Sequence, residues 1–231
     1  MLPFDEIYLM NLVERVDRYH RMRYRIEYMG WDVKDFRVVK HPISDKIVNK
    51  INNDLGGEGF AINNGGVFNC TREHYTIIKS AYLRGLNTVG IIEDDCSFFK
   101  DKNVWMNYME NLPSDWNILR INCLRGGNEE RYCCQSEDYW VPQKSNLCGT
   151  GFYVMDRVGM KYMIDSIDKC YQPIDEPLSK PNFNINIYIP KIELSLCLED
   201  SFKSDIHFGC SEEGIHTNFR NIKGFKKENY I

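Results

Sequence analysis

The sequence of 231 residues contains no run of about 18 apolar residues, the length that a helix needs to cross a bilayer. Its first residues lack the apolar centre of a secretory signal. Basic residues are not in excess, because 29 Lys and Arg stand against 33 Asp and Glu, a net charge of −4. These absences predict no transmembrane segment, a cytoplasmic location and no nucleic-acid partner.

The sequence also lacks a Cys-x-x-Cys pair, so its nine cysteines do not indicate a zinc site. Without a secretory signal we expect them to be mostly reduced thiols. Whether the adjacent Cys133 and Cys134 are oxidised stays open. Asn69 heads a glycosylation triplet, but it falls where a helix is expected to start, which argues against its modification.

No internal repeat and no second apolar core are present. With 43% apolar and 27% charged residues, the chain has the composition of an ordinary globular protein, and its length suits one domain. We therefore predict a single domain over residues 1–231 with a basic C-terminal tail at 217–231. That tail is either a solvated end or a peripheral contact with an anionic membrane surface.

Short apolar runs alternate with helical patterns, which predicts a doubly wound α/β sheet. Glycine and asparagine at 56–59 and 63–66 indicate a flexible loop, and the polar segment 125–146 indicates a long loop that could close over a ligand. Gly30 is expected to stop the first helix. The predicted strands are 6–12, 32–39, 88–93, 116–122, 147–155 and 186–189. The first predicted helix ends at about residue 29, and four further helices are predicted at 45–55, 71–83, 105–111 and 159–168.

The most informative stretch is an apolar run that ends in Glu93, Asp94 and Asp95. Three adjacent carboxylates repel one another and lose hydration unless a cation lies among them. Open α/β sheets bind ligands at the carboxyl ends of their strands, where these acids are expected to lie. A solvated acidic turn is the alternative interpretation.

Together with this triplet, three further segments resemble glycosyltransferase family 25, the lipopolysaccharide and collagen-type sugar transferases. Residues 7–18 are similar to the start of the family's sequences, which is a strand followed by Asn-Leu and then by arginines. Residues 66–74 keep a glycine, the cysteine and the histidine of its Gly-Glu-Ile-Gly-Cys-x-x-Ser-His segment. Residues 149–159 look like its Gly-Thr-x-x-Tyr-x-x-x-Arg-x-Gly turn. The resemblance covers roughly residues 6–207 and rests on the order and spacing of the segments.

The resemblance implies a GT-A-like fold, which is α/β and doubly wound (Rossmann-like), with a mixed sheet flanked by helices. It also implies an inverting, metal-dependent transferase of lipopolysaccharide biosynthesis type that moves a hexose, with galactose favoured. The donor is a nucleotide-sugar, with a UDP-sugar favoured, and the acceptor is a glycan or protein. Val67, Asn69 and Glu73 depart from the family pattern near the expected donor loop.

The departure of a diphosphate from the donor calls for a cation, and carboxylates suit Mn or Mg. We expect Asp95 to bind this metal, assisted by Asp94, with Glu93 or Asp94 on the ribose or the metal. Arg15 and Arg18 stand where a strand feeds a helix, which suits phosphates or simply a charged surface. Gly149 and Thr150, with Gly151, would let a substrate approach the backbone. The residues expected to bind the nucleotide-sugar are Asn11, Leu12, Arg15, Arg18, His74, Glu93, Asp94, Gly149 and Thr150.

Inversion by direct displacement needs a base for the acceptor hydroxyl. Asp175 and Glu176 occupy a proline-flanked turn, and the resemblance places the acid at Asp175. A surface turn is the alternative. His207 and His216 are weaker candidates for ligands.

Two rival functions remain at this stage. A nucleotidyltransferase would share the α/β nucleotide-binding arrangement and the acidic metal site. That class usually carries a Gly-rich basic loop after the first strand, and this chain does not. A catalytically inactive transferase-like binding module is disfavoured by the intact acidic triplet.

Overall fold

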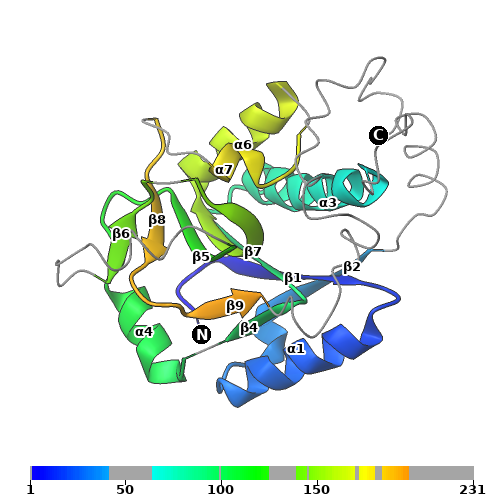
Figure 1. The fold of residues 1–231 in the computed structure, drawn as a ribbon, viewed down its shortest axis with the longest axis vertical. Coiled ribbons are helices and arrows are strands. Elements are labelled where there is room, and N and C mark those ends of the chain that lie inside the picture. The colour runs from blue at the N-terminus through cyan, green and yellow to red at the C-terminus, as the bar shows by residue number, and fades with distance from the viewer. Residues whose placement is uncertain are drawn as a thin grey trace.

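The computed structural model describes residues 2–41, 64–98, 100–124, 139–144, 146–169, 172–179 and 184–197. The centre of this described part is a seven-stranded sheet in the order β2-β1-β3-β7-β5-β8-β6 (Figure 1). Its strands are β1 (Glu6–Leu12), β2 (Phe36–His41), β3 (Thr88–Glu93), β5 (Ile118–Leu124), β6 (Trp140–Pro142), β7 (Cys148–Asp156) and β8 (Ile187–Pro190).

The direction of the strands makes this sheet mixed. β1 runs parallel to β2 and β3, and β5 runs parallel to β8. β7 lies between β3 and β5 and runs antiparallel to both. As a result, the first residues of β7 lie beside the carboxyl end of β3. A separate two-stranded sheet pairs β4 (Cys96–Phe98) with β9 (Ser195–Cys197).

Helices cover both faces of the sheet (Figure 1). α3 (Asn64–Leu83), α6 (Arg157–Lys169) and the short α7 (Glu176–Ser179) lie on one face, and α1 (Val16–Tyr28) and α4 (Lys102–Glu110) on the other. Neighbouring strand residues alternate between two cores: Met10 and Tyr153 pack with α3 and α6, whereas Leu9 and Phe152 pack with α1 and α4. This confirms the predicted α/β, doubly wound, mixed sheet flanked by helices.

The first strand and the stop of the first helix at Gly30 are confirmed, and Gly30 has a φ of +68°. The second strand was expected from residue 32 but begins at Phe36. Residues Val33–Asp35 form a 3-10 helix, η1, because the Asp32 side chain accepts the backbone N–H of Lys34 at 2.9 Å. This local bond draws the backbone away from the strand ladder.

The prediction of a loop at 63–66 and a helix from residue 71 was wrong at its start, because α3 already begins at Asn64. Further along, α3 buries Ile77, Ile78 and Ala81 in the core. We attribute the early start to this packing, which outweighs a cost of about 1 kcal/mol for each glycine. Asn69 is buried on α3, which agrees with the expectation that it is not glycosylated.

The predicted long loop at 125–146 contains a strand, since β6 pairs with β8. Trp140 is buried there, and its indole N–H donates to the carbonyl of Tyr108 at 2.9 Å. The rest of this loop at 125–138, the predicted helix at 45–55, Cys133, Cys134, His207, His216 and the tail at 217–231 lie outside the described residues. The other predicted elements are present with ends shifted by a few residues.

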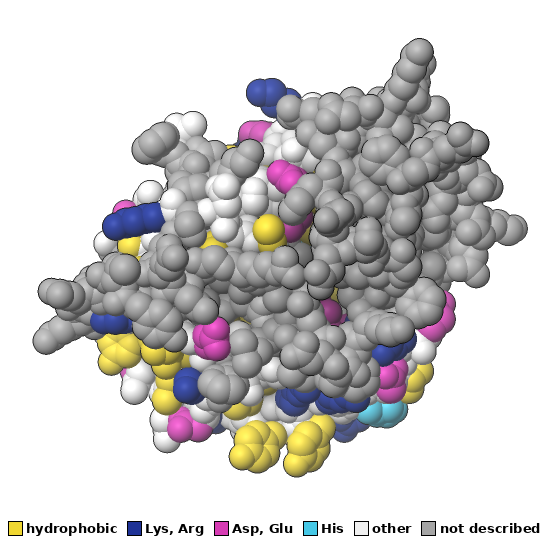
Figure 2. Space-filling model, in the orientation of Figure 1, with side chains coloured by type: hydrophobic (Ala, Val, Ile, Leu, Met, Phe, Trp, Pro, Cys, Tyr) yellow, Lys and Arg dark blue, Asp and Glu magenta, His cyan; other side chains and the backbone are white. Residues whose placement is uncertain are grey.

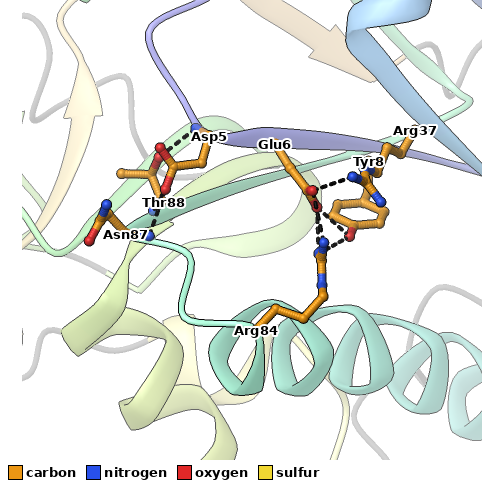
Figure 3. Close-up of polar contacts among 7 residues, drawn as sticks. All are labelled: Asp5, Glu6, Tyr8, Arg37, Arg84, Asn87 and Thr88. Carbon is orange, nitrogen blue, oxygen red and sulfur yellow. Dashed lines mark hydrogen bonds and ion pairs between the residues drawn. The ribbon is translucent and has the colours of Figure 1, made fainter.

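A charged network fixes the amino end of β1 (Figure 3). The carboxylate of Glu6 accepts hydrogen bonds from Arg84, the residue directly after α3, one of them at 2.8 Å, and one from the Tyr8 hydroxyl at 2.7 Å. Arg37 of β2 lies 2.5 Å from the same carboxylate. Asp5 binds the backbone N–H of Asn87 at 2.6 Å, just before β3. Three strands and one helix are thereby joined at the end opposite the acidic triplet.

The outer face of α1 carries exposed aromatic rings. Tyr24 is 67% and Tyr28 79% exposed, and the rings stack with centroids 6.4 Å apart. Hydrophobic and basic side chains gather along the lower edge of the molecule, where α1 lies (Figure 2). Among the described residues, no helix combines the length and the apolar character needed to cross a membrane.

Candidate active site

The acidic triplet lies where strands of opposite direction meet. Glu93 ends β3 beside the carboxyl end of β1, and the start of β7 lies on its other side. The chain turns at Asp94 and Asp95 before it enters β4. Because the strand ends at Glu93, the alternation that would put Glu93 and Asp95 on one face does not reach Asp95. The triplet is therefore at the carboxyl ends of the parallel strands β1 and β3, where the sequence predicts a ligand.

Asp94 is held between β1 and α1. Its Oδ2 accepts from Asn11 Nδ2 at 2.6 Å, and its Oδ1 pairs with Arg18 Nη1 at 3.2 Å. All three side chains are buried. Burial raises the pKa of Asp94, although Asn11 and Arg18 counteract part of that rise. Arg18 therefore serves as the partner of an acid and does not lie open to solvent as a free phosphate ligand.

Glu93 is bound from the side of β7 and α3. Its Oε1 accepts from the Thr150 hydroxyl at 2.7 Å and lies 3.3 Å from His74 Nε2. Burial works to raise the pKa of Glu93, but His74, Thr150 and Arg18 outweigh it and the pKa is lowered. Glu93 is accordingly an ionised, oriented carboxylate that keeps 24% of its side chain exposed.

His74 is fully buried on α3 and lies beneath Glu93. Its Nδ1 lies 2.7 Å from the hydroxyl of Tyr153, with the two rings stacked. Cys70 stands one helical turn earlier, and its thiol has a pKa raised well above the ordinary value by burial and by nearby carboxylates. A buried histidine cannot touch a donor directly, so any role in donor binding passes through Glu93.

Asp95 and the end of β1 form the outer part of the site. Asp95 is half-buried in the turn and lies near Arg25, whose guanidinium donates to the Cys96 carbonyl at 2.5 Å. Burial lowers the pKa of Arg25, and the charge of Asp95 counteracts part of that fall. Leu12 is half-buried, and Arg15 pairs with the neighbouring Asp17 at 3.1 Å. Arg15 contributes its carbonyl, which accepts from the Asn11 amide at 3.0 Å.

The turn that carries Asp175 is tied to the start of β7. Asp175 Oδ2 accepts the backbone N–H of Gly149 at 3.2 Å. Gly149 has a φ of +85°, a conformation that glycine adopts without strain. The guanidinium of Arg120 on β5 donates to the carbonyls of Gly149 at 2.6 Å and Leu178 at 2.9 Å. One buried arginine thus joins the strand to the helix that follows Asp175.

The expectation for Gly151 needs correction. A Cβ at this position would lie 2.6 Å from Cys96 Sγ and 3.1 Å from the side chain of Asn122. The close approach at Gly151 is therefore made by β4 and β5 of the chain itself, because these elements pack directly against β7. A substrate has no room there.

Sequence reasoning assigned no role to Arg120, Asn122 or Cys70. Arg120 had a signal, since an arginine inside the apolar run at 118–121 is unusual for a buried strand. Asn122 donates to the Ser195 hydroxyl at 3.3 Å, a contact between distant segments that no local pattern shows. The approach of Cys70 to Glu93 depends on how α3 packs against β3.

Two surface cavities lie away from these residues. One of about 230 Å³ is at the amino ends of β1 and β2 and is lined by Leu2, Phe36 and Arg37 among others. The other, of about 500 Å³, lies along α6 between Tyr82 and Ile185. Neither cavity is lined by a residue of the acidic triplet. The candidate site is therefore identified from the chemistry and contacts of its side chains and not from a cavity.

Known proteins of related structure include several transferases. Mouse xyloside xylosyltransferase 1 is 8% identical, with 70% of each chain covered and a TM-score of 0.32. A mannose-1-phosphate geranyltransferase of Thermus thermophilus is 8% identical, covering 83% of this chain and 73% of its own, with a TM-score of 0.43. The galactosyltransferase LgtC is 13% identical, covering 79% and 72%, with a TM-score of 0.37. No curated protein matches the sequence.

Sequence comparison with protein families gives a match over most of the chain. Residues 4–178 match glycosyltransferase family 25, described as a lipopolysaccharide biosynthesis protein. The match includes β1, the acidic triplet, the start of β7 and the turn at Asp175, which the structure brings to one edge of the sheet. The chain belongs to glycosyltransferase family 25.

Proposed function

We propose that this glycosyltransferase is metal-dependent and inverting, and that it moves a hexose from a UDP-sugar to a hydroxyl of a glycan or protein acceptor. Galactose is the favoured hexose. One observation carries the proposal: polar residues from distant parts of the chain meet at one end of the sheet, where Asn11 donates to Asp94, Thr150 donates to Glu93, and the Gly149 N–H donates to Asp175. Such convergence of carboxylates and hydrogen-bond donors suits a charged donor better than it suits a structural turn.

The donor set fits a hard divalent cation, Mn or Mg, at Asp95 and Asp94. Asp95 offers carboxylate oxygens in a half-exposed turn, and each oxygen of Asp94 keeps a lone pair beyond the hydrogen bond it already accepts. When bound, the cation neutralises charge that develops on the leaving diphosphate. Asn11 and Arg18 hold Asp94 in place for this role.

The remaining residues bind the donor in this proposal. Glu93, fixed by Thr150 and His74 through Oε1, accepts a hydrogen bond from a ribose hydroxyl with Oε2. Leu12 is the last residue of β1 and Arg15 the cap of α1, and both lie next to where the nucleotide would bind. Gly149 and Thr150 present the start of β7 to the sugar.

Asp175 is the proposed base for the acceptor hydroxyl. It takes the hydroxyl proton as the oxygen attacks the anomeric carbon, and the Gly149 N–H and the Arg120 contacts hold the turn that carries it. A positioned base contributes about 10²- to 10⁴-fold in rate. Glu176 begins α7 and is the matched control, because it adjoins Asp175 in the same turn.

The donor and metal parts are tested by thermal shift and by UDP release. We expect UDP to stabilise the wild type only with Mn, and Asp95→Asn to lose this effect while it melts like the wild type without ligand. Asp95→Asn is cleaner than Asp94→Asn, because Asp94 is also the partner of buried Arg18. Persistence of Mn-dependent UDP binding in Asp95→Asn would contradict the metal assignment, and turnover of only GDP- or CMP-sugars would contradict the donor.

The base is tested by Asp175→Asn. We expect donor and metal affinity near the wild-type values, with transfer reduced at least about 100-fold. Glu176→Gln should reduce transfer much less. Loss of donor binding in Asp175→Asn would make it a binding residue, and unchanged transfer would make it part of an ordinary surface turn.

A cytoplasmic location with contact at a membrane surface is also part of the proposal, supported by the family's description as a lipopolysaccharide biosynthesis protein. Cell fractionation tests it, because recovery of the protein outside the cytoplasm would contradict it.

A further inference from the structure

Beneath the acidic edge, three donor atoms of different chemistry converge. The Cys70 thiol, a His74 ring nitrogen and a Glu93 carboxylate oxygen all lie within 4.8 Å of one another. Cys70 and His74 are four residues apart on α3, so they project from the same side of the helix. Glu93 completes the group from the end of β3.

We propose that Cys70, His74 and Glu93 form a binding site for a soft divalent cation of the Zn²⁺ type. This site is separate from the hard-cation site at Asp94 and Asp95. Thiolate, imidazole and carboxylate are the ligands that zinc takes in proteins, and a site with three protein ligands leaves a fourth position for water.

The geometry of His74 and Glu93 already suits a tetrahedral ion. Two ligand atoms that each lie about 2.0–2.1 Å from tetrahedral zinc are roughly 3.3 Å apart. His74 Nε2 and Glu93 Oε1 are 3.3 Å apart. Within the described residues, Nε2 is fully buried and makes no hydrogen bond, although it points at the carboxylate. A cation between the two atoms would satisfy both.

The other side of the imidazole is arranged as metal sites require. A ligating histidine is usually held by a hydrogen bond through its second ring nitrogen, which fixes the ring and the tautomer. Here His74 Nδ1 lies 2.7 Å from the Tyr153 hydroxyl, and both side chains are fully buried. Cys70 and Glu93 are only partly buried, which leaves a path for the ion.

Binding of the ion changes the local bonding in a defined way. The Cys70 thiol loses its proton to solvent as the sulfur–metal bond forms. The imidazole of His74 carries its proton on Nδ1, which donates to the Tyr153 hydroxyl, so that Nε2 offers its lone pair to the cation. The direct approach of His74 to Glu93 is replaced by two bonds to the cation. Glu93 Oε2 stays available, so the site does not compete with the proposed donor contact.

Spectroscopy with Co²⁺ as the probe tests the site without any need for catalysis. We titrate the full chain with Co²⁺ after treatment with chelator. The expected result is the strong visible absorption of tetrahedral Co²⁺ with a thiolate-to-cobalt band in the near ultraviolet, both removed by Zn²⁺. Cys70→Ser should lose the thiolate band, and His74→Gln should bind at least about 10-fold more weakly. Tyr153→Phe, which keeps the ring, should weaken binding about 10-fold.

Matched variants separate this site from others. Cys148→Ser and the double variant Cys133→Ser/Cys134→Ser should keep the full Co²⁺ spectrum. Asp95→Asn should also keep it, even though it loses the Mn-dependent effect of UDP, so the two proposals fail independently. Circular dichroism of Cys70→Ser and His74→Gln shows whether each is folded. A thiolate band unchanged in folded Cys70→Ser, or no tetrahedral spectrum in the wild type, overturns the proposal.

Discussion

Replacement of Glu6 by glutamine isolates one charge in the network at the amino end of β1 (Figure 3). The hydrogen bonds from Arg84 are the main reason that the pKa of Glu6 falls from 4.5 to about 2; burial opposes the fall, while Tyr8 and Arg37 add to it. Because the pKa is lowered on folding, the stability from this group is fully present above about pH 4.5. It is lost as the pH falls toward about 2.

The size of the effect follows from that shift. A change from 4.5 to about 2 corresponds to at most about 3.4 kcal/mol at neutral pH. Glu6 is only 12% exposed, but its partners Arg84 and Arg37 are 37% and 59% exposed, so water screens the pair. We therefore expect Glu6→Gln to lower the free energy of unfolding at pH 7 by about 1–2 kcal/mol. For a chain of this length, that is roughly 2–8 °C in Tm.

Urea denaturation at pH 7 and at a series of lower pH values measures this loss. The control is Glu27→Gln, because Glu27 pairs with Arg23 on the exposed face of α1, where both side chains are more than half exposed. That variant should lose at most about 0.5 kcal/mol. The difference between Glu6→Gln and the wild type should vanish toward pH 2. Equal stability at pH 7, or a deficit that does not change with pH, would refute the reasoning.

Three further substitutions test the packing and the site. Gly159→Ala places a Cβ 2.4 Å from the Asn117 carbonyl oxygen and should cost about 1–3 kcal/mol, so an unchanged urea midpoint would contradict the close contact. Thr150→Val removes the hydroxyl that donates to Glu93 and should lower stability by about 1 kcal/mol above pH 5; equal thermal melting would refute this. Arg120→Met removes the guanidinium that donates to the carbonyls of Leu147 and Gly149 and should cost about 1–3 kcal/mol, which a normal Tm would exclude.

The residues of the site were predictable where one short segment carries the signal. An apolar run ending in Glu93, Asp94 and Asp95 identifies a strand and the edge at which it ends. That step needs only local sequence and the rule that ligands bind at the carboxyl ends of strands. A role for Asn11 was implied by the resemblance to the family, and in the structure its amide donates to Asp94.

Contacts between distant segments were not predictable from the pattern. The pairing of Arg18 with Asp94 links residues 76 positions apart, and in the sequence Arg18 reads as one of several arginines on a helix. The role of Arg120 depends on four acceptors from three later segments, among them Gln143 and Leu178. Periodicity fixes which face a residue occupies but not which partner arrives there.

The antiparallel position of β7 has a consequence for how the protein is made. β1, β2 and β3 are complete once Glu93 has been synthesised, yet β3 can pair on its open side only with β7, which begins at Cys148. At about 5–20 residues per second, a ribosome needs roughly 3–10 s to make the intervening chain. During that interval the nascent half-sheet presents an apolar edge, the kind of surface on which chaperones act and aggregation starts. Substitutions that weaken β7 should therefore reduce the yield of folded protein in cells more than its measured stability would suggest.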